Sequence, residues 1–545
     1  MQDFFKMFLL IRGKNVTLQG KKKSSMAYTK ETLVVSNPSE HHSPAARLKA
    51  ALVLLCCLLT CLSFFPLTSA AQDVRLRSCR MRTARQAHHG DTNLAKRRAQ
   101  TGAKYIGDRR QLVVMASFSD QGFATDDYLL LWDDIFNAED YSKEPFVGSV
   151  SDYFYAQSYG QLRLHFDLVP LTVGPRVRYR STAKDDENSQ YLIYDIADML
   201  ATMDIDWPAY DWDADGYIDQ LLVIYAGRGM NDGGDSTTIW PHQWWLSEHI
   251  DPETDLPAQP RQITTDDGTT YTIDAYCAVQ ELDSKDSYGT FGTLCHEYSH
   301  CFGLPDFYYG RTSFVGAWDL MDYGNNNGDG FRPCGYSAHE RWFMGWLKLT
   351  ELKEPTTVSG MAALGDEPQA YLIRSGGNDD EYYIVENRQQ TGWDEGLPGS
   401  GILVFHVDYN YDVWTGCGEW PNTVSYQRYD IFAASNKRTR TGRKGWGYPF
   451  ETNDSLTDTS TPAATLNSDN SDGTRLMHKP LTAMKVDGGL ASFDFMGGRV
   501  ATAIGSASSD KDAPDVIYDL SGRRIRRTGI ARGLYIVNGR KKAFY

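Results

Sequence analysis

The pattern of apolar and polar positions divides the chain into a region that mixes helices and strands, up to about residue 350, and a strand-rich region after it. Continuous apolar runs predict buried strands at 112–118 and 218–225. Apolar residues spaced three and four apart predict a helix over 190–203. The stretch 149–171 predicts a helix, a break at Gly160 and then an alternating strand. This mixture predicts an α+β fold.

The later part of the chain has a different texture. Short apolar runs alternate with Gly, Asn, Asp and Ser, which predicts a β-rich domain over 354–499. The polar stretch 500–514 is typical of a linker. The last segment, 515–545, predicts two or three short strands with tight turns. We therefore expect a first folded domain at 106–353, followed by the β-rich domain and a small β tail.

The N-terminal segment 1–71 is expected to be an export signal. Residues 50–67 form an apolar run without a charge, which follows Arg47 and Lys49 and precedes small residues ending at Ala71. This order predicts cleavage near Ala71, with no stable membrane insertion afterwards. The alternative is a retained membrane anchor, because the run is just long enough to span a bilayer. Residues 72–105 are polar and basic and predict an exposed linker or a short propeptide.

Charge and cysteine content fit an exported protein. The chain has a net charge of −15, and without residues 1–71, which hold nine Lys/Arg and three Asp/Glu, the net charge is −21. An acidic body argues against nucleic acid as a partner and suits calcium. Six cysteines remain beyond residue 71, so disulfides are possible in an oxidising compartment. Cys295 and Cys301 lie on one predicted helix and are not expected to pair with each other.

The segment 292–310, "GTLCHEYSHCFGLPDFYYG", carries the strongest chemical signal. His296 and His300 are four residues apart, so on a helix both imidazoles face one side and can share a zinc ion. Glu297 would act as general base toward a water on the metal. Gly303 allows the chain to turn, and Asp306 is the expected third ligand. Three protein ligands leave one open position, which is typical of a catalytic zinc site.

Residues beyond the motif extend the prediction. Met321, in "AWDLMDYG", is expected to form a hydrophobic floor beneath the zinc. Tyr323, two residues later, is a candidate for stabilising the oxyanion, and a packed aromatic is its alternative role. Glu340 could replace Asp306 as third ligand if the site were of the thermolysin type. Gly303 and Asp306 would then be coincidental, so Asp306 is favoured.

At this point the chain resembles the immune inhibitor A-like family of secreted bacterial zinc metallopeptidases. The likeness covers about 106–410 and includes "HEYSHCFGLPDFY", "SVSDYFYAQSYGQL", "DWDADGYIDQLLVIYAGRG" and "GAWDLMDYG", in order. The resemblance implies a metzincin-like catalytic domain, zinc on His296, His300 and Asp306, Glu297 as catalytic base, and bound calcium. The long propeptide typical of larger members is not expected in this chain.

The segment 515–545 resembles the C-terminal sorting tails of Bacteroidetes proteins, through "IYDLSGRR" and "GLYIVNGRK". That resemblance implies the type IX secretion machinery as a partner and export past the outer membrane. The alternative is a small structural β unit without an export role.

An acidic loop, "DWDADGYID", precedes the strand predicted at 218–225. Its four carboxylates stand at positions 1, 3, 5 and 9 around a glycine at position 6: Asp211, Asp213, Asp215 and Asp219. This spacing matches a calcium loop, although position 12 is Leu222 rather than the glutamate of an EF-hand. We expect a structural calcium ion, with a solvated acidic turn as the alternative.

Together these features predict an exported or cell-surface zinc endopeptidase that hydrolyses protein or peptide substrates. The alternative is a calcium-binding surface adhesin on a catalytically silent protease scaffold. Glu297 discriminates between the two, because inactive relatives usually lose the base or a ligand, and this chain retains all four residues.

Overall fold

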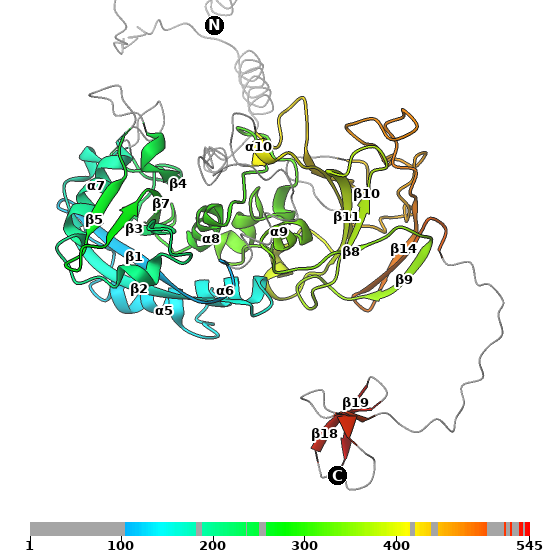
Figure 1. Cartoon of the computed structure of the whole chain (residues 1–545), viewed down its shortest axis with the longest axis horizontal. Coiled ribbons are helices and arrows are strands. Elements are labelled where there is room, and N and C mark those ends of the chain that lie inside the picture. The colour runs from blue at the N-terminus through cyan, green and yellow to red at the C-terminus, as the bar shows by residue number, and fades with distance from the viewer. Residues whose placement is uncertain are drawn as a thin grey trace, which may run out of the picture. The chain divides into compact units, whose positions relative to one another are not determined.

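The computed structural model describes residues 104–180, 188–235, 237–249, 258–414, 420–437 and 445–498, and the backbone of four short strands between 517 and 544. The first part of the chain contains helices α5 to α9 and strands β1 to β7 (Figure 1). The helices are α5 (Tyr128–Asn137), α6 (Val150–Gln157), α7 (Ser189–Leu200), α8 (Phe291–Ser299) and α9 (Ala338–Phe343). The strands are β1 (Gly107–Phe118), β2 (Leu162–Val173), β3 (Leu221–Arg228), β4 (His242–Trp245), β5 (Arg261–Thr264), β6 (Thr270–Ile273) and β7 (Ala275–Leu282).

The main sheet of this part has five strands in the order β2-β1-β3-β7-β4. The first four are parallel, and the edge strand β4 runs antiparallel to β7. β5 and β6 form a separate two-stranded sheet.

Both faces of the main sheet are buried, which explains the continuous apolar run in β1. Val113 and Met115 belong to a core that also contains residues of α5, α6 and α8. Leu112 and Val114 point to the opposite face, into a core with residues of α7. The helix α8, which carries the histidine motif, therefore packs on a sheet whose two sides are both covered.

The second part of the chain is almost entirely β-structure. A five-stranded sheet has the order β13-β12-β11-β10-β8, and a three-stranded sheet has the order β14-β15-β9. The strands are β8 (Thr350–Glu351), β9 (Thr356–Met361), β10 (Tyr371–Arg374), β11 (Glu381–Arg388), β12 (Gly401–Asp408), β13 (Tyr429–Ile431), β14 (Leu481–Asp487) and β15 (Leu490–Phe495), with a short helix α10 (Tyr411–Trp414). One buried core contains residues from both of these sheets.

The two parts share a core. The face of β11 and β12 that carries Tyr382, Ile384 and Phe405 belongs to the same buried cluster as the residues of α8. Arg388, at the end of β11, is fully buried and donates to the carbonyls of Trp318 and Gly335. This packing attaches the β-rich part directly to the segment that carries Met321, the residue expected to lie beneath the zinc.

The predicted α+β fold class is confirmed, and so is a β-rich second part. The strand predicted at 218–225 runs three residues later, over Leu221–Arg228, because the acidic loop occupies the first positions. Pattern reasoning missed α5, β4 and β7. The tail contains four short strands rather than two or three: β16 (Ile517–Tyr518), β17 (Arg524–Ile525), β18 (Gly533–Val537) and β19 (Arg540–Phe544). The domain boundaries stay predictions.

Several predictions fall outside the described residues: the export signal with its cleavage near Ala71, almost all of the segment 72–105, and the linker 500–514. Among the described residues, no helix combines the length and apolar character needed to span a membrane.

Candidate functional site

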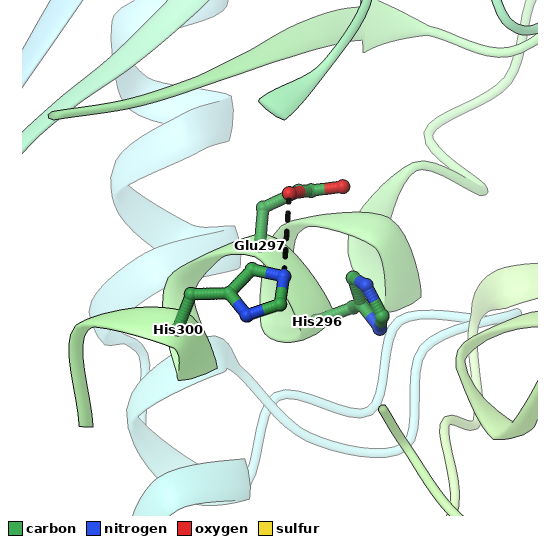
Figure 2. Close-up of side chains that lie close together, drawn as sticks. All are labelled: His296, Glu297 and His300. Carbon is green, nitrogen blue, oxygen red and sulfur yellow. Dashed lines mark ion pairs between the residues drawn. The ribbon is translucent and has the colours of Figure 1, made fainter. Parts of the chain in front are cut away.

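The helix α8 brings the motif residues to one buried place. Figure 2 shows His296 and Glu297 on α8 and His300 on the 3-10 turn His300–Phe302 that continues it. The opposite side of α8 carries Leu294, Cys295 and Tyr298 into the core shared with the main sheet. The helix is therefore fixed by apolar packing on one side and presents the motif side chains on the other.

A glycine ends this helix and redirects the chain. Gly303 has φ of 84°, and its N–H donates to the carbonyl of His300. Only glycine adopts this left-handed conformation without strain. Pro305 follows and bars a further helical turn. The turn returns the chain so that Asp306 lies against the two histidines.

The ligand atoms are spaced as a metal site requires. Nε2 of His296 and Nε2 of His300 lie 3.1 Å and 3.5 Å from Oδ1 of Asp306. Ligand atoms about 2.0–2.1 Å from a tetrahedral zinc ion lie about 3.3 Å from each other. His296, Glu297 and His300 also offer ligand atoms within 4.8 Å of one another, but Glu297 Oε2 is 3.9 Å from His300 Nε2. Asp306 therefore lies nearer to the distance of a third ligand than Glu297.

Buried polar atoms of His300 and Asp306 show whether a metal ion fits here. Among the described residues, neither Nε2 of His300 nor either carboxylate oxygen of Asp306 makes a hydrogen bond, although both side chains are about 99% buried. A buried polar atom without a partner costs about 1–3 kcal/mol. Two imidazole nitrogens and a carboxylate oxygen are the donors that zinc prefers. The residues present therefore fit a zinc ion.

Backbone carbonyls orient both imidazoles. Nδ1 of His296 lies 2.8 Å from the carbonyl oxygen of Leu320, and Nδ1 of His300 lies 2.8 Å from that of Leu304. A carbonyl only accepts, so each Nδ1 carries a proton, and each Nε2 is directed toward Asp306, where it can bind a metal ion once it carries no proton. This is the usual outer-shell arrangement of metal-binding histidines.

The two histidines differ in their affinity for protons before a metal binds. Burial lowers the pKa of His300 to about 4, against the opposing charge of Asp306. Burial also disfavours the charged form of His296, but the Asp306 and Glu297 carboxylates outweigh it and raise its pKa to about 9. A metal ion at this place would displace the proton of His296, so metal binding would release a proton.

Hydrogen bonds hold the segment around Met321 against the residues of the motif. Met321 is fully buried, and its carbonyl accepts from the N–H of Phe307, next to Asp306. Its own N–H donates to Asp319, whose pKa is raised to about 7 by burial. Oδ2 of Asp322 accepts from three backbone N–H groups, of residues 314–316. These bonds fix the turn that also supplies the Leu320 carbonyl to His296.

A cavity opens beside the motif. His296 and Glu297 line it, together with Tyr308, whose ring stacks on that of His296 with centroids 6.2 Å apart. The segment 325–330 borders it through Asn325, Asn326 and Gly330. Tyr323 is half-buried and does not belong to the cavity wall.

The alternative third ligand, Glu340, is used differently. On α9 its Oε2 accepts from the N–H and the hydroxyl of Ser337, which forms a capping box. Its side chain therefore faces the start of its own helix.

Two further histidines are packed in the interior. His242 contacts the Trp240 carbonyl and the Tyr276 hydroxyl, and His406 pairs with Glu381. Among the described residues, four cysteines are free: Cys277, Cys295, Cys301 and Cys334.

The acidic loop brings three of its four predicted ligands together. Asp211, Asp213 and Asp215 offer oxygens within 4.8 Å of one another. Asp219 is turned inward, and the ammonium of Lys104 contacts both it and Asp213. Burial raises the pKa of Asp219 to about 6, although the Lys104 charge opposes this shift. A lysine thus occupies part of the predicted calcium loop.

Sequence reasoning missed several contributors to these sites. The carbonyls of Leu304 and Leu320 carry no side-chain signal. Tyr308 follows Asp306 by two residues and could have been found from that spacing. Lys104 is separated from Asp219 by more than one hundred residues, so no local pattern connects them.

Comparisons with known proteins agree with the geometry. Residues 124–348 match the family model described as the immune inhibitor A peptidase M6 catalytic domain. Among curated proteins, "Immune inhibitor A" of Bacillus thuringiensis subsp. alesti is 27% identical over 156 residues, which cover 25% of this chain. The chain spans about a fifth of that relative's length, 21%. The family resemblance predicted from the motifs is thereby confirmed: residues 124–348 are similar to the catalytic domain of the M6 family of peptidases.

Proposed function

We propose that this chain is an exported zinc endopeptidase that hydrolyses protein or peptide substrates. The observation that carries the proposal is the convergence of ligand atoms without hydrogen bonds. Nε2 of His300 and Oδ1 of Asp306 have no hydrogen-bond partner among the described residues, and both lie beside His296. The match of 124–348 to a family of peptidases supports the same reading.

The motif residues divide into a binding set and a reacting residue. His296, His300 and Asp306 would hold the zinc ion. Zinc at this place would supply an acidified water and polarise the scissile carbonyl. Glu297 lines the cavity and is 5% exposed, so it can reach a substrate while it remains shielded from bulk water. Glu297 accepts the proton of the attacking water and then donates it to the leaving amine.

Two further roles belong to the proposal. Tyr323 would donate its hydroxyl to the oxyanion after its side chain rotates toward the cavity. Calcium would bind the loop that contains Asp211, Asp213, Asp215 and Asp219 and would rigidify it. Each site would prefer its own ion. The zinc site contains nitrogen ligands, which zinc favours, and the loop offers only oxygens, which calcium favours.

The proposed localisation rests on the two ends of the chain. The apolar segment 50–67 would direct export, and the tail 515–545 would engage a secretion machinery. Mass spectrometry of the protein collected from the culture medium tests both segments. Mature protein that begins upstream of residue 50 would contradict export through this signal.

The decisive experiment compares the wild-type chain with Glu297→Gln. We expect the wild type to contain one zinc ion per chain, to cleave casein, and to lose activity to a chelator. Glu297→Gln should keep its zinc and lose at least about 10²–10⁴-fold in kcat, because a positioned general base contributes that factor. Tyr323→Phe should lower kcat about 10²-fold with little change in KM, as loss of an oxyanion donor does.

The outcomes separate the alternatives. Zinc binding without cleavage by the wild type would favour a binding protein on a protease scaffold. Cleavage that survives chelation and the Glu297 substitution would contradict the metal-hydrolase mechanism altogether.

A further inference from the structure

The wall of the cavity that Glu297 lines also carries several hydrogen-bond acceptors. It includes Gln280 on β7, Asn231 and Asp232 in the loop after β3, and Asp283 just beyond β7. None of the described residues that line this cavity is Lys or Arg. Glu297 thus shares this cavity with several side chains that offer oxygen atoms.

Gln280 is the most informative of these residues. Its side chain is 1% exposed and belongs to the cavity wall, and its Oε1 has no hydrogen-bond partner among the described residues. Oδ1 of Asn231 likewise has none. Both amides lie against the backbone of Gly229: a Cβ there would be 2.9 Å from Cδ of Gln280 and 2.6 Å from Oδ1 of Asn231. Two acceptors without partners therefore lie close together at one end of the cavity.

Negative charge accompanies these acceptors. Asp232 and Asp283 are 7% and 4% exposed. The oxygens of Asp283 accept from the N–H groups of Lys285 and Ser287 and from the Ser287 hydroxyl, which are neutral donors. They satisfy the carboxylate geometrically. The hydrogen bond to Asp286 raises the pKa of nearby Arg228, and the charges of Asp283 and Asp232 add to that shift.

Arg228 ends β3 and Lys285 closely follows β7 in the chain, but neither belongs to the cavity wall. Arg228 donates to Asp286 at 2.8 Å, and Lys285 pairs with Asp329 at 3.2 Å. Neither carboxylate partner belongs to the cavity wall. Among the described residues that line the cavity, no lysine or arginine is therefore present to pair with these acceptors.

A metal ion is not the best occupant. An ion needs its ligand atoms within a few ångströms of one another. In the described part of the chain, the groups that meet this condition are the His296 set and the Asp211 set, and neither includes Asp232 or Asp283. An apolar side chain would leave the acceptor of Gln280 buried and unpaired, which is costly. Dispersed acceptors with negative charge fit an extended organic cation.

We propose that this cavity is a specificity subsite for a basic substrate residue, with arginine preferred over lysine. A guanidinium presents five N–H donors in a planar fork, which can reach the amide oxygens of Gln280 and Asn231 as well as a carboxylate. The lysine ammonium is a compact point charge and can satisfy fewer separated acceptors. This inference rests on the proposed peptidase function and names the substrate class that it acts on.

The test uses the full chain and quenched fluorescent peptides that differ at one position only. Each series carries arginine, lysine, citrulline, norleucine or glutamate at successive positions around the cleaved bond. Citrulline keeps the shape of arginine without its charge. We expect one position at which arginine exceeds citrulline in kcat/KM by at least about tenfold, as one charged hydrogen bond in a buried site provides.

Two variants connect that preference to the cavity. Gln280→Met keeps the side-chain volume and removes the acceptor, and Asp232→Asn removes a charge. Each should reduce the ratio of arginine to norleucine about tenfold. Gln220→Met is the matched control, because Gln220 is also 1% exposed with an amide that has no partner, and it lies outside the cavity wall. It should leave the ratio unchanged.

A binding measurement keeps this inference separate from the proposed function. The same peptides are titrated against Glu297→Gln by fluorescence anisotropy, so turnover is not needed. Tighter binding of the arginine peptide than of the citrulline peptide, reduced by Gln280→Met, supports the subsite even if no cleavage occurs. Two outcomes overturn the subsite and leave the peptidase function standing. In the first, the wild type cleaves the arginine peptide no better than the citrulline peptide. In the second, the preference for arginine survives both Gln280→Met and Asp232→Asn.

Discussion

The motif site and the acidic loop both bring together side chains that can bind metal, but these side chains are buried at the motif site and largely exposed in the loop. At the motif site, His296, His300 and Asp306 are almost completely buried, and carbonyls fix the imidazole orientation. In the loop, Asp213 and Asp215 are exposed to solvent. The first arrangement is costly without an ion, whereas the second is stable in water on its own.

The two sites also differ in the hydrogen-bond donors and cations that surround their carboxylates. The loop carboxylates accept backbone N–H groups, as when Asp211 accepts from Asp215 and Gly216. Lys104 adds a cation. Neither carboxylate oxygen of Asp306 accepts a hydrogen bond from a backbone N–H of the described residues. Spacing in a sequence therefore shows which atoms can converge, while the surrounding donors decide how much an ion would add.

The largest expected effect breaks the motif site through its third ligand. Asp306→Asn removes the charge and keeps the shape of the side chain. We expect zinc affinity to fall by more than about 100-fold, because even outer-shell substitutions cost 10–100-fold, and cleavage should become undetectable. Zinc content by mass spectrometry and casein cleavage measure the two effects.

Glu340→Gln is the control for Asp306→Asn, since Glu340 is the rival ligand and lies in a capping box on α9. It should keep zinc and activity in the folded protein. Zinc retained by Asp306→Asn and lost by Glu340→Gln would reverse the assignment of the third ligand.

The second prediction concerns the cation of the acidic loop. Lys104→Met should lower the free energy of unfolding by about 3 kcal/mol without calcium, because it leaves Asp219 buried beside no cation. The side chains of Lys104 and Asp219 are 11% and 5% exposed, so solvent screens the pair weakly. Chemical denaturation measures this difference. Arg475→Met removes a well-exposed pair with Asp469 and should change stability by less than about 1 kcal/mol.

The effect of calcium on stability should differ between Lys104→Met and the wild type. The Lys104 ammonium contacts Asp213 and Asp219, so it competes with an ion for two of the four predicted ligands. Calcium should therefore raise the melting temperature of Lys104→Met more than that of the wild type. An equal response of both proteins would show that calcium does not bind at these carboxylates.

The sequence contained much of the motif site and little of its surroundings. Residue spacing identified His296, Glu297, His300 and Asp306, because a helix and one glycine turn translate that spacing directly into geometry. The strand β7, which precedes α8 and supplies Gln280, was missed because its apolar positions are interrupted by polar residues that the fold buries. The Lys104 contact was missed because it depends on how the whole chain folds.

The smallest expected effect is the dependence of calcium affinity on pH. Asp219 has a pKa raised to about 6 by burial, so its protonated form is favoured in the folded state. Without calcium, the stability that this shift provides is fully present below about pH 4 and is lost as the pH rises through 6. Calcium requires the deprotonated carboxylate, so its affinity should rise about tenfold between pH 5 and pH 7. Titration calorimetry of the wild type and of Asp219→Asn tests this, because the variant cannot titrate at this position. The same pH dependence in both proteins would assign the proton to another group, whereas loss of the dependence in Asp219→Asn would make the buried carboxylate a functional member of the loop rather than only a partner of Lys104.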